Sequence, residues 1–397
     1  MKKILITFLI LSVVSIGLFG FFGSADAAWY DGTWNYRIKI TIDNTKVDAD
    51  LTDFPIYVNL DDLPDATFWA NVKANCADVR ITTSDEVTEV PREIVVCNTG
   101  TKTGEMHFKG SPLNATDTVF YIYYGNSAAT EPAANATYGS QNVWTSSFQA
   151  VYHLQQDPSG NGVDAVLDST SNAYHTTPFG SPVNGTGKLA GNAITFAAVD
   201  DQLKDTDQVW ADANNAITVS VWSNFASADT AQQATLFRYT TSGNERNSAH
   251  APWASTDYWD FGTCCTSPGR ISGSNTAYDD KYSLFHFTGG ANHEIYIDGA
   301  SRYAAGSSDS PTGALTGFAI GSGIDTEWHK GTLDEFRVAT VERTSTWIST
   351  EYNNQNSPST FYSLTAQETP PSTAETSIPI RINNGGIRIN NGGIIIK

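Results

Sequence analysis

The sequence predicts an all-β protein of two domains, each a β-sandwich or barrel, followed by a short C-terminal repeat tail. Short runs that alternate apolar and polar residues recur along the chain, with turn residues between them. Aromatic residues make up 12% of the sequence and charged residues only 16%, a balance typical of extracellular β-proteins. A length of 397 residues fits two domains with appendages.

The N-terminal segment, residues 1–27, has the features of a signal peptide. Lys2 and Lys3 precede an apolar run from Ile4 to Phe22, and Ala25-Asp26-Ala27 supplies a small-x-small cleavage site. Cleavage after Ala27 leaves a mature chain that is secreted or held at the cell surface. The alternative is an uncleaved membrane anchor, because about 20 apolar residues are enough to cross a bilayer.

The first domain is predicted over residues 28–130. WNYRIKITI and FPIYVNL alternate apolar and polar residues, as half-buried strands do. VFYIYY, from Val119 to Tyr124, is continuously apolar and is expected to be covered on both faces. Small, turn-prone residues then form a connector over 131–143.

The second domain is predicted over residues 144–366. ITVSVW, TLFRY, DYWDF, YSLFHF, HEIYIDG, GFAIG and LDEFRV follow one another as short strands. The single expected helix is short, near Ser345 to Glu351. A Pro/Thr linker covers 367–377 and an Ile/Asn/Gly repeat tail covers 378–397.

The tail repeats IRINNGG, and Asn-Gly favours a tight turn. Three interpretations stay open: miniature hairpins whose strands pair with another chain, a recognition tail for surface attachment, or an extension without fixed structure.

Four cysteines in an exported chain are candidates for disulfides, and four allow three pairings. Cys76 and Cys97 share one segment and form the natural pair. Cys264 and Cys265 are adjacent, and a bond between neighbours is expected to be strained.

Two sets of sequence blocks resemble known families. From Trp29 to about Thr130, WYDGTWNYRIKITIDNTKVDADLTDFPIYVNL, ADVRIT, VPREI and TVFYIYYGNSAAT resemble a domain of unknown function at the start of secreted bacterial, archaeal and viral proteins. From about Trp144 to Leu364, VYHL, LDSTSNAYHTT, GKLAGNAITFAAVDDQL, AITVSVW, EIYIDG and GTLDEFRVATVERTSTWISTEYNNQNSPSTFYSL resemble the concanavalin A-like lectin/glucanase superfamily, in its laminin-G-like branch. The first resemblance implies no activity. The second implies a concanavalin A-like jelly roll that often binds carbohydrate and often carries structural Ca²⁺.

The charge balance argues against nucleic acid as a partner. Asp and Glu number 42 against 23 Lys and Arg, a net charge of −19, whereas phosphate binding needs clustered cations. No catalytic residues are predicted either. Glycosidases of the superfamily use carboxylates spaced to share one strand face, but Asp334 and Glu335 are consecutive and are expected to face opposite ways.

Calcium is the one predicted cofactor, as a structural ion. By resemblance its candidate ligands are Asp168 in LDSTSN, Asp200 in AAVDDQL and Asp334 in LDEFRV. In the alternative interpretation, Asp168 caps a turn and Asp334 pairs with a donor such as Arg337 or Lys330.

The stretch HAPWASTDYWDFGTCCTSPGR gathers the candidate ligand-binding residues. Aromatic rings stack on sugar faces, and polar groups beside them fix the hydroxyls. Its spacing does not fit zinc. Consecutive Tyr258 and Trp259 face opposite sides of a strand, so at most one of them lines a given cleft. The alternative interpretation is that these large aromatic residues belong to the core or its rim. The candidate set is His250, Trp253, Tyr258, Trp259, Asp260 and Arg270.

Taken with the resemblance, these residues predict an exported, non-catalytic carbohydrate-binding or adhesion protein whose partner is a glycan or cell-surface polysaccharide. The alternative is a structural surface or appendage component that assembles with other surface proteins through its tail. A polysaccharide-active hydrolase is the third interpretation.

Overall fold

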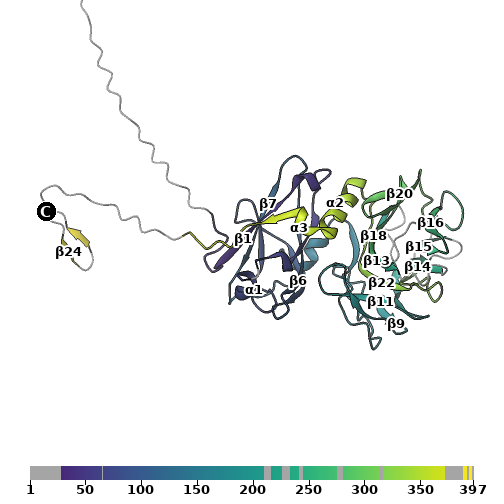
Figure 1. The fold of residues 1–397 in the computed structure, drawn as a ribbon, viewed down its shortest axis with the longest axis horizontal. Coiled ribbons are helices and arrows are strands. Elements are labelled where there is room, and N and C mark those ends of the chain that lie inside the picture. Colours follow the sequence, from purple (N-terminus) through teal and green to yellow (C-terminus); the bar gives the residue numbers. More distant parts are fainter. Residues whose placement is uncertain are drawn as a thin grey trace, which may run out of the picture. The chain divides into compact units, whose positions relative to one another are not determined.

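A computed structural model describes residues 28–64, 66–209, 216–225, 233–240, 245–274, 280–312, 316–371, 388–390 and 393–395 (Figure 1). It is 44% strand and 10% helix, and its sheets are antiparallel, so the predicted all-β class is confirmed. Residues Trp29–Pro370 form one compact unit. The predicted signal peptide lies outside the described residues.

The first sandwich stacks a five-stranded sheet on a three-stranded one. The five-stranded sheet, in spatial order, is β23 (Tyr362–Leu364), β1 (Tyr36–Ile42), β7 (Thr118–Tyr124), β3 (Arg80–Thr83) and β4 (Glu89–Val90). The three-stranded sheet is β2 (Phe54–Asn59), β6 (Thr103–Gly110) and β5 (Arg92–Asn98). Alternate residues of both sheets, such as Ile40, Ile122 and Phe108, fill the core between them.

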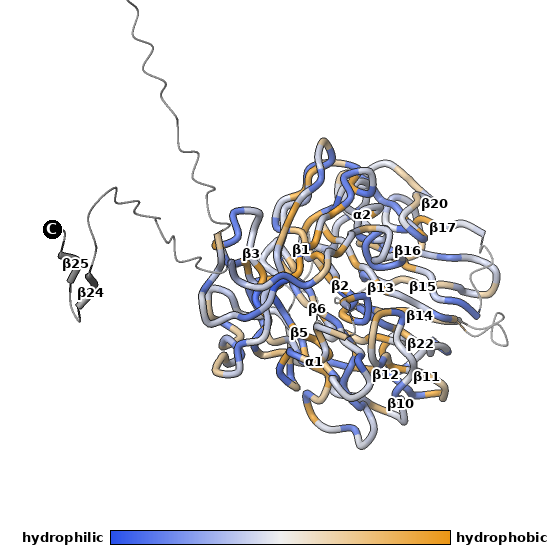
Figure 2. The backbone as a smooth tube through the Cα atoms, turned by 60° about the vertical axis from the view of Figure 1, so that its left-hand side comes forward, coloured by the Kyte–Doolittle hydropathy of each residue, from blue (hydrophilic) through white to orange (hydrophobic). Residues whose placement is uncertain are grey.

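The second sandwich pairs an eight-stranded and a seven-stranded sheet. The eight-stranded sheet is β10 (Val183–Thr186), β11 (Asn192–Phe196), β22 (Gly331–Ala339), β13 (Ile217–Phe225), β18 (Tyr282–Gly289), β19 (His293–Ile297) and β20 (Ala300–Ala305), with β8 (Phe148–Tyr152) also paired to β22. The seven-stranded sheet is β17 (Arg270–Ser274), β16 (Thr256–Thr263), β15 (Glu245–Trp253), β14 (Gln233–Thr240), β21 (Thr316–Ile320), β12 (Gln202–Val209) and β9 (Thr177–Phe179). Val221, Phe237, Trp259 and Phe336 belong to the core between these sheets. Hydrophobic and hydrophilic segments succeed one another along the strands (Figure 2).

After the last strand of the second sandwich, the chain adds one more strand to the first sandwich. Helix α2 (Ser345–Asn356) and helix α3 (Pro358–Phe361) lead into β23, which pairs with β1 through Ile40 opposite Leu364. The predicted second domain, 144–366, thus supplies the edge strand of the first sheet. The division into 28–130 and 144–366 stays a prediction.

Helix α2 extends five residues beyond the predicted end at Glu351, reaching Asn356. Three of the five added residues are asparagines, which are poor helix formers, so the pattern did not reveal them. Tertiary hydrogen bonds hold them instead. Asn354 accepts from the Tyr57 backbone N–H at 2.7 Å and donates to its carbonyl at 2.9 Å, and Gln355 accepts from Trp222 at 2.6 Å.

The remaining elements are short. They are the 3₁₀ turns η1 (Asn44–Lys46), η2 (Leu60–Asp62) and η3 (Ser140–Trp144), helix α1 (Phe68–Asn71), and, in the tail, β24 (Arg388–Asn390) and β25 (Gly393–Ile395). The two tail strands pair antiparallel, which confirms a miniature hairpin over this copy of the repeat. No helix within the described ranges is long and apolar enough to cross a membrane.

Both cysteine pairs are joined. The predicted Cys76–Cys97 disulfide is confirmed, with Cα atoms 6.0 Å apart. Cys264 and Cys265, whose pairing the sequence left open, also form a disulfide, in the loop after β16.

Candidate functional site

Five of the six candidate ligand residues lie on the outer face of the seven-stranded sheet. On β15 and β16, His250 is opposite Tyr258 and Ser248 is opposite Asp260. Side chains of such pairs share a face. Their neighbour Trp259 points the other way, into the core.

Trp259 therefore belongs to the core and is not a ligand-binding residue of this face. Its side chain is fully buried, and its indole N–H donates to the carbonyl of Thr288 at 2.9 Å. For Trp259, the alternative prediction of a core residue is confirmed. Trp253 is half-buried, and its ring lies edge-on to His250 with centroids 4.9 Å apart.

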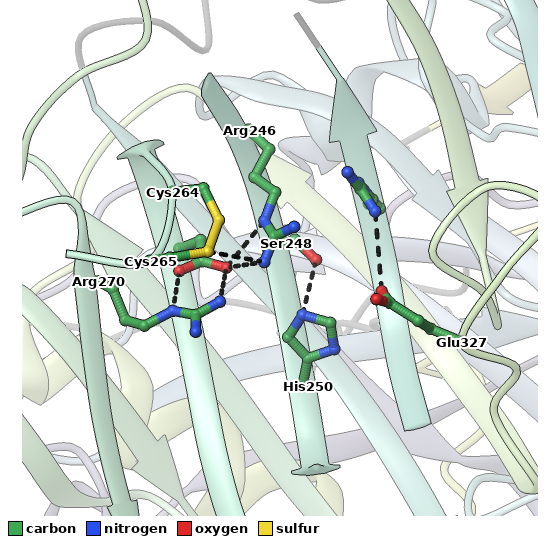
Figure 3. The surroundings of a disulfide bond; sticks show 9 residues. Arg246, Ser248, His250, Cys264, Cys265, Arg270 and Glu327 are labelled. Atoms are coloured by element: carbon green, nitrogen blue, oxygen red, sulfur yellow. Dashed lines mark hydrogen bonds and ion pairs between the residues drawn. A yellow bond between two sulfur atoms is a disulfide. The ribbon is translucent and has the colours of Figure 1, made fainter. Parts of the chain in front are cut away.

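An ion cluster lies on β15, β16 and β17, toward the β17 edge of this sheet (Figure 3). The buried carboxylate of Asp260 accepts from Arg270 at 2.5 and 2.7 Å and from Arg246 at 2.9 and 2.7 Å. Burial raises the pKa of Asp260, but hydrogen bonds and charge from the two arginines outweigh it and hold that pKa below its usual range. Arg246 also reaches the Cys265 sulfur at 3.9 Å.

The surrounding groups add rings and hydrogen-bonding atoms. The Arg270 guanidinium lies over the ring of half-buried Tyr258, 4.6 Å from its centroid. His250 is fully buried and bonds Thr235 at 2.8 Å. Burial, with help from the charge of Arg246, lowers the pKa of His250 to about 3, so this imidazole is neutral at physiological pH.

This face carries more positive than negative charge. Arg238 lies 3.7 Å from Glu327, beside the cluster of Arg246, Arg270 and Asp260. Three guanidinium groups thus meet two carboxylates in a chain whose net charge is −19. Such a surface can stack a sugar ring and donate hydrogen bonds to its oxygens.

Two of the three predicted calcium ligands, Asp168 and Asp334, accept hydrogen bonds from backbone N–H groups. Asp168 accepts from the N–H groups of Val151, Thr170 and Tyr174 at 2.9 Å each, the geometry of a turn cap. Asp200 is exposed, with φ +86°.

Asp334 accepts from the N–H groups of Lys188 and Leu189, at 2.8 and 3.1 Å, while Arg337 pairs with Glu335 and Glu351. Burial raises its pKa to about 8. Within the described residues the three predicted aspartates do not gather into one ligand set. Calcium binding stays a prediction.

The expectation that Asp334 and Glu335 face opposite ways is wrong. A β-bulge interrupts the pairing of β22 with β13, and Glu335 has φ +51°. Leu333 and Phe336 both enter the core, so the two carboxylates between them lie on the outer face of the eight-stranded sheet.

Sequence reasoning missed a buried group where the two sandwiches meet. Glu105, His107, His153 and Glu335 each place one oxygen or nitrogen within 4.8 Å of the others. We call it the histidine–glutamate cluster. Glu105-Met106-His107 was the available signal, because residues two apart share a strand face. The partners His153 and Glu335 are distant in sequence.

Comparison with known proteins gives distant likenesses only. No protein-family model and no curated protein matches the chain. Among solved structures, the receptor-binding domain of botulinum neurotoxin C/D mosaic serotype aligns at 15% identity and TM-score 0.40, covering 53% of this chain and 51% of the other. Domain 4 of AbnA, an extracellular arabinanase from Geobacillus stearothermophilus, aligns at 20% identity and TM-score 0.41, covering 52% and 98%. These likenesses are too weak to support a conclusion about function.

Proposed function

We propose that the protein is an exported, non-catalytic glycan-binding or adhesion protein, and that the outer face of the seven-stranded sheet binds the glycan. The observation that carries the proposal is the fixed arrangement of Tyr258, Arg270, Asp260 and Arg246 on one face. Preorganised rings and donors reduce the entropy that binding costs.

The charge of the face favours glycans that carry carboxylate or sulfate groups. Asp260 occupies only part of the donor set of two arginines, whose side chains are 12% and 20% exposed. A guanidinium group has five N–H donors, so each can also bond an anionic sugar.

Export is supported by the signal-like segment and by the Cys76–Cys97 disulfide, since disulfides persist in oxidising compartments.

The test is a glycan array probed with the wild-type protein and with Tyr258→Ala. We expect binding to acidic glycans, weakened about 5- to 30-fold in the variant, because loss of one stacking ring costs on the order of 1–2 kcal/mol. Tyr138→Ala is the matched control, since Tyr138 is an exposed tyrosine outside the sheets and its loss leaves binding unchanged. Absence of glycan binding, or equal binding by Tyr258→Ala, contradicts the proposal.

The tail hairpin favours a second candidate, a structural component that assembles through edge pairing of β24 or β25. Deleting residues 377–397 tests it. Assembly or surface retention that survives the deletion rejects this role and leaves the glycan proposal intact.

A further inference from the structure

We propose that the histidine–glutamate cluster binds a divalent transition metal of the zinc class and thereby joins the two sandwiches. Glu105 and His107 belong to β6 of the first sandwich. His153 follows β8 and Glu335 lies in β22, both in the second sandwich. All four side chains are at least 96% buried, so such an ion would be enclosed by protein.

The spacing of the ligand atoms suits one small ion. His153 Nδ1 lies 2.6 Å from Glu335 Oε1 and 3.4 Å from Glu105 Oε1. His107 Nε2 lies 3.0 Å from Glu105 Oε1 and 3.9 Å from Glu335 Oε2. Ligands about 2.0–2.1 Å from a tetrahedral zinc are about 3.3 Å from one another, so these separations bracket the required value.

Outer groups already hold the ligands in the orientation that metal sites use. The second nitrogen of His153, Nε2, lies 3.4 Å from Glu93 Oε2, as in carboxylate–histidine–metal arrangements. Arg337 donates to Glu335 Oε2, and Gln155 lies 3.4 Å from Glu105 Oε2. Glu105 Oε1 therefore faces both imidazoles, and Glu335 Oε1 faces that of His153.

The cluster also has an excess of buried negative charge. Glu93, Glu105 and Glu335 surround His153 at 2.6–3.4 Å, whereas Arg337 pairs with Glu335. Buried carboxylates are costly unless a cation compensates them. A divalent ion would supply that charge, and a proton retained on His153 is the competing explanation.

His107 is the one of the four ligands without such an outer partner, because its fully buried Nδ1 has no hydrogen-bond partner among the described residues.

The donor set selects the metal. Two imidazole nitrogens and two carboxylate oxygens suit zinc and neighbouring first-row ions, whereas calcium and magnesium prefer oxygen throughout. Four buried protein ligands leave no open position, so the ion would be structural.

The experiment uses the full chain, stripped with a chelator and titrated with Zn²⁺ and, separately, Co²⁺. We expect about one Zn²⁺ per chain by elemental mass spectrometry, a raised melting temperature, and the visible absorption of tetrahedral Co²⁺. Glu105→Gln and His153→Gln are expected to lose more than about 10-fold in Zn²⁺ affinity, since even outer-shell changes cost 10- to 100-fold.

His286→Gln is the matched control. His286 is a fully buried histidine that pairs with Glu351 at 3.1 Å and lies outside the four ligands, so the variant should bind Zn²⁺ as the wild type does. Should the ligand variants fail to fold by circular dichroism, the wild-type cobalt spectrum decides. A stripped wild-type protein that takes up no Zn²⁺ and gives no tetrahedral Co²⁺ spectrum overturns the proposal and favours the proton. Folded ligand variants that bind Zn²⁺ like the wild type overturn it too.

Discussion

The two outer faces of the second sandwich carry similar ion pairs in different surroundings. On the eight-stranded sheet, Arg337 pairs with Glu335 and Glu351 and is 1% exposed, because helix α2 and the ring of Trp144 cover it. On the seven-stranded sheet, Arg246 and Arg270 pair with Asp260 and keep 12% and 20% exposure. Arginine–carboxylate pairs thus stabilise the fold on the covered face. On the open face, the same kind of pair leaves arginine N–H donors accessible to solvent.

Removing the covered guanidinium should have the largest effect. Arg337→Ala leaves Glu335 and Glu351 buried without their cation, and we expect a loss of about 3–5 kcal/mol in unfolding free energy. Chemical denaturation measures it. Arg302→Ala, on the exposed side of β20, should change stability by less than about 0.5 kcal/mol. If both substitutions lowered the unfolding free energy equally, burial of Arg337 would not be the source of its contribution to stability.

Two neighbouring aromatic residues on β16 lie in different environments: Trp259 is in the core and Tyr258 is on the open face. Trp259→Ala should cost about 3–5 kcal/mol in stability, because it empties a buried site. Tyr258→Ala should cost less than about 1 kcal/mol while weakening glycan binding. Denaturation curves of both variants test the assignment, which fails if Tyr258→Ala is the more destabilised.

The ion cluster on the open face should show a smaller, pH-dependent effect. Asp260→Asn removes charge-assisted hydrogen bonds and should cost about 2 kcal/mol at pH 7. The pKa of Asp260 is lowered in the folded protein, so its contribution is present above the unfolded pKa of about 4 and is lost as pH falls through the folded pKa. The stabilities of wild type and variant should begin to converge as the pH falls below about 4 and become equal only below the folded pKa. A difference that stays constant from pH 7 to pH 3 would show that the carboxylate charge is not the cause.

The smallest effect is expected at the start of α2, which contacts both sandwiches. The Thr344 hydroxyl accepts from the Trp347 backbone N–H at 3.2 Å. Thr344→Ala should cost about 1 kcal/mol, and Thr344→Ser should restore most of it. Melting temperatures of the two variants measure the cap.

Strands with a regular period could be predicted from the sequence. β1 alternates from Tyr36 to Ile42 as expected, and Ile38, Ile40 and Ile42 are buried. β7 is covered on both sides, because Ile122 enters the core while Tyr123 packs against Trp34. The β-bulge at Glu335 could not be predicted, since nothing in LDEFRV marks the extra residue.

The candidate site was predicted in part. Tyr258, Asp260 and Arg270 share a face because they lie on adjacent strands, and local alternation was enough to expect this of the first two. Arg246 was missed because it lies on β15 outside the quoted stretch. The histidine–glutamate cluster depends on how two sandwiches meet, which no local pattern encodes.

The pairing of β23 with β1 has a consequence for folding. Ile40 pairs with Leu364, so the first sheet gains its edge strand only when nearly the whole chain is available. Domains usually fold in order of synthesis, and contacts this distant in sequence form slowly. The N-terminal sandwich is therefore the last to be completed, and until then the edge of β1 is open to pairing with other chains.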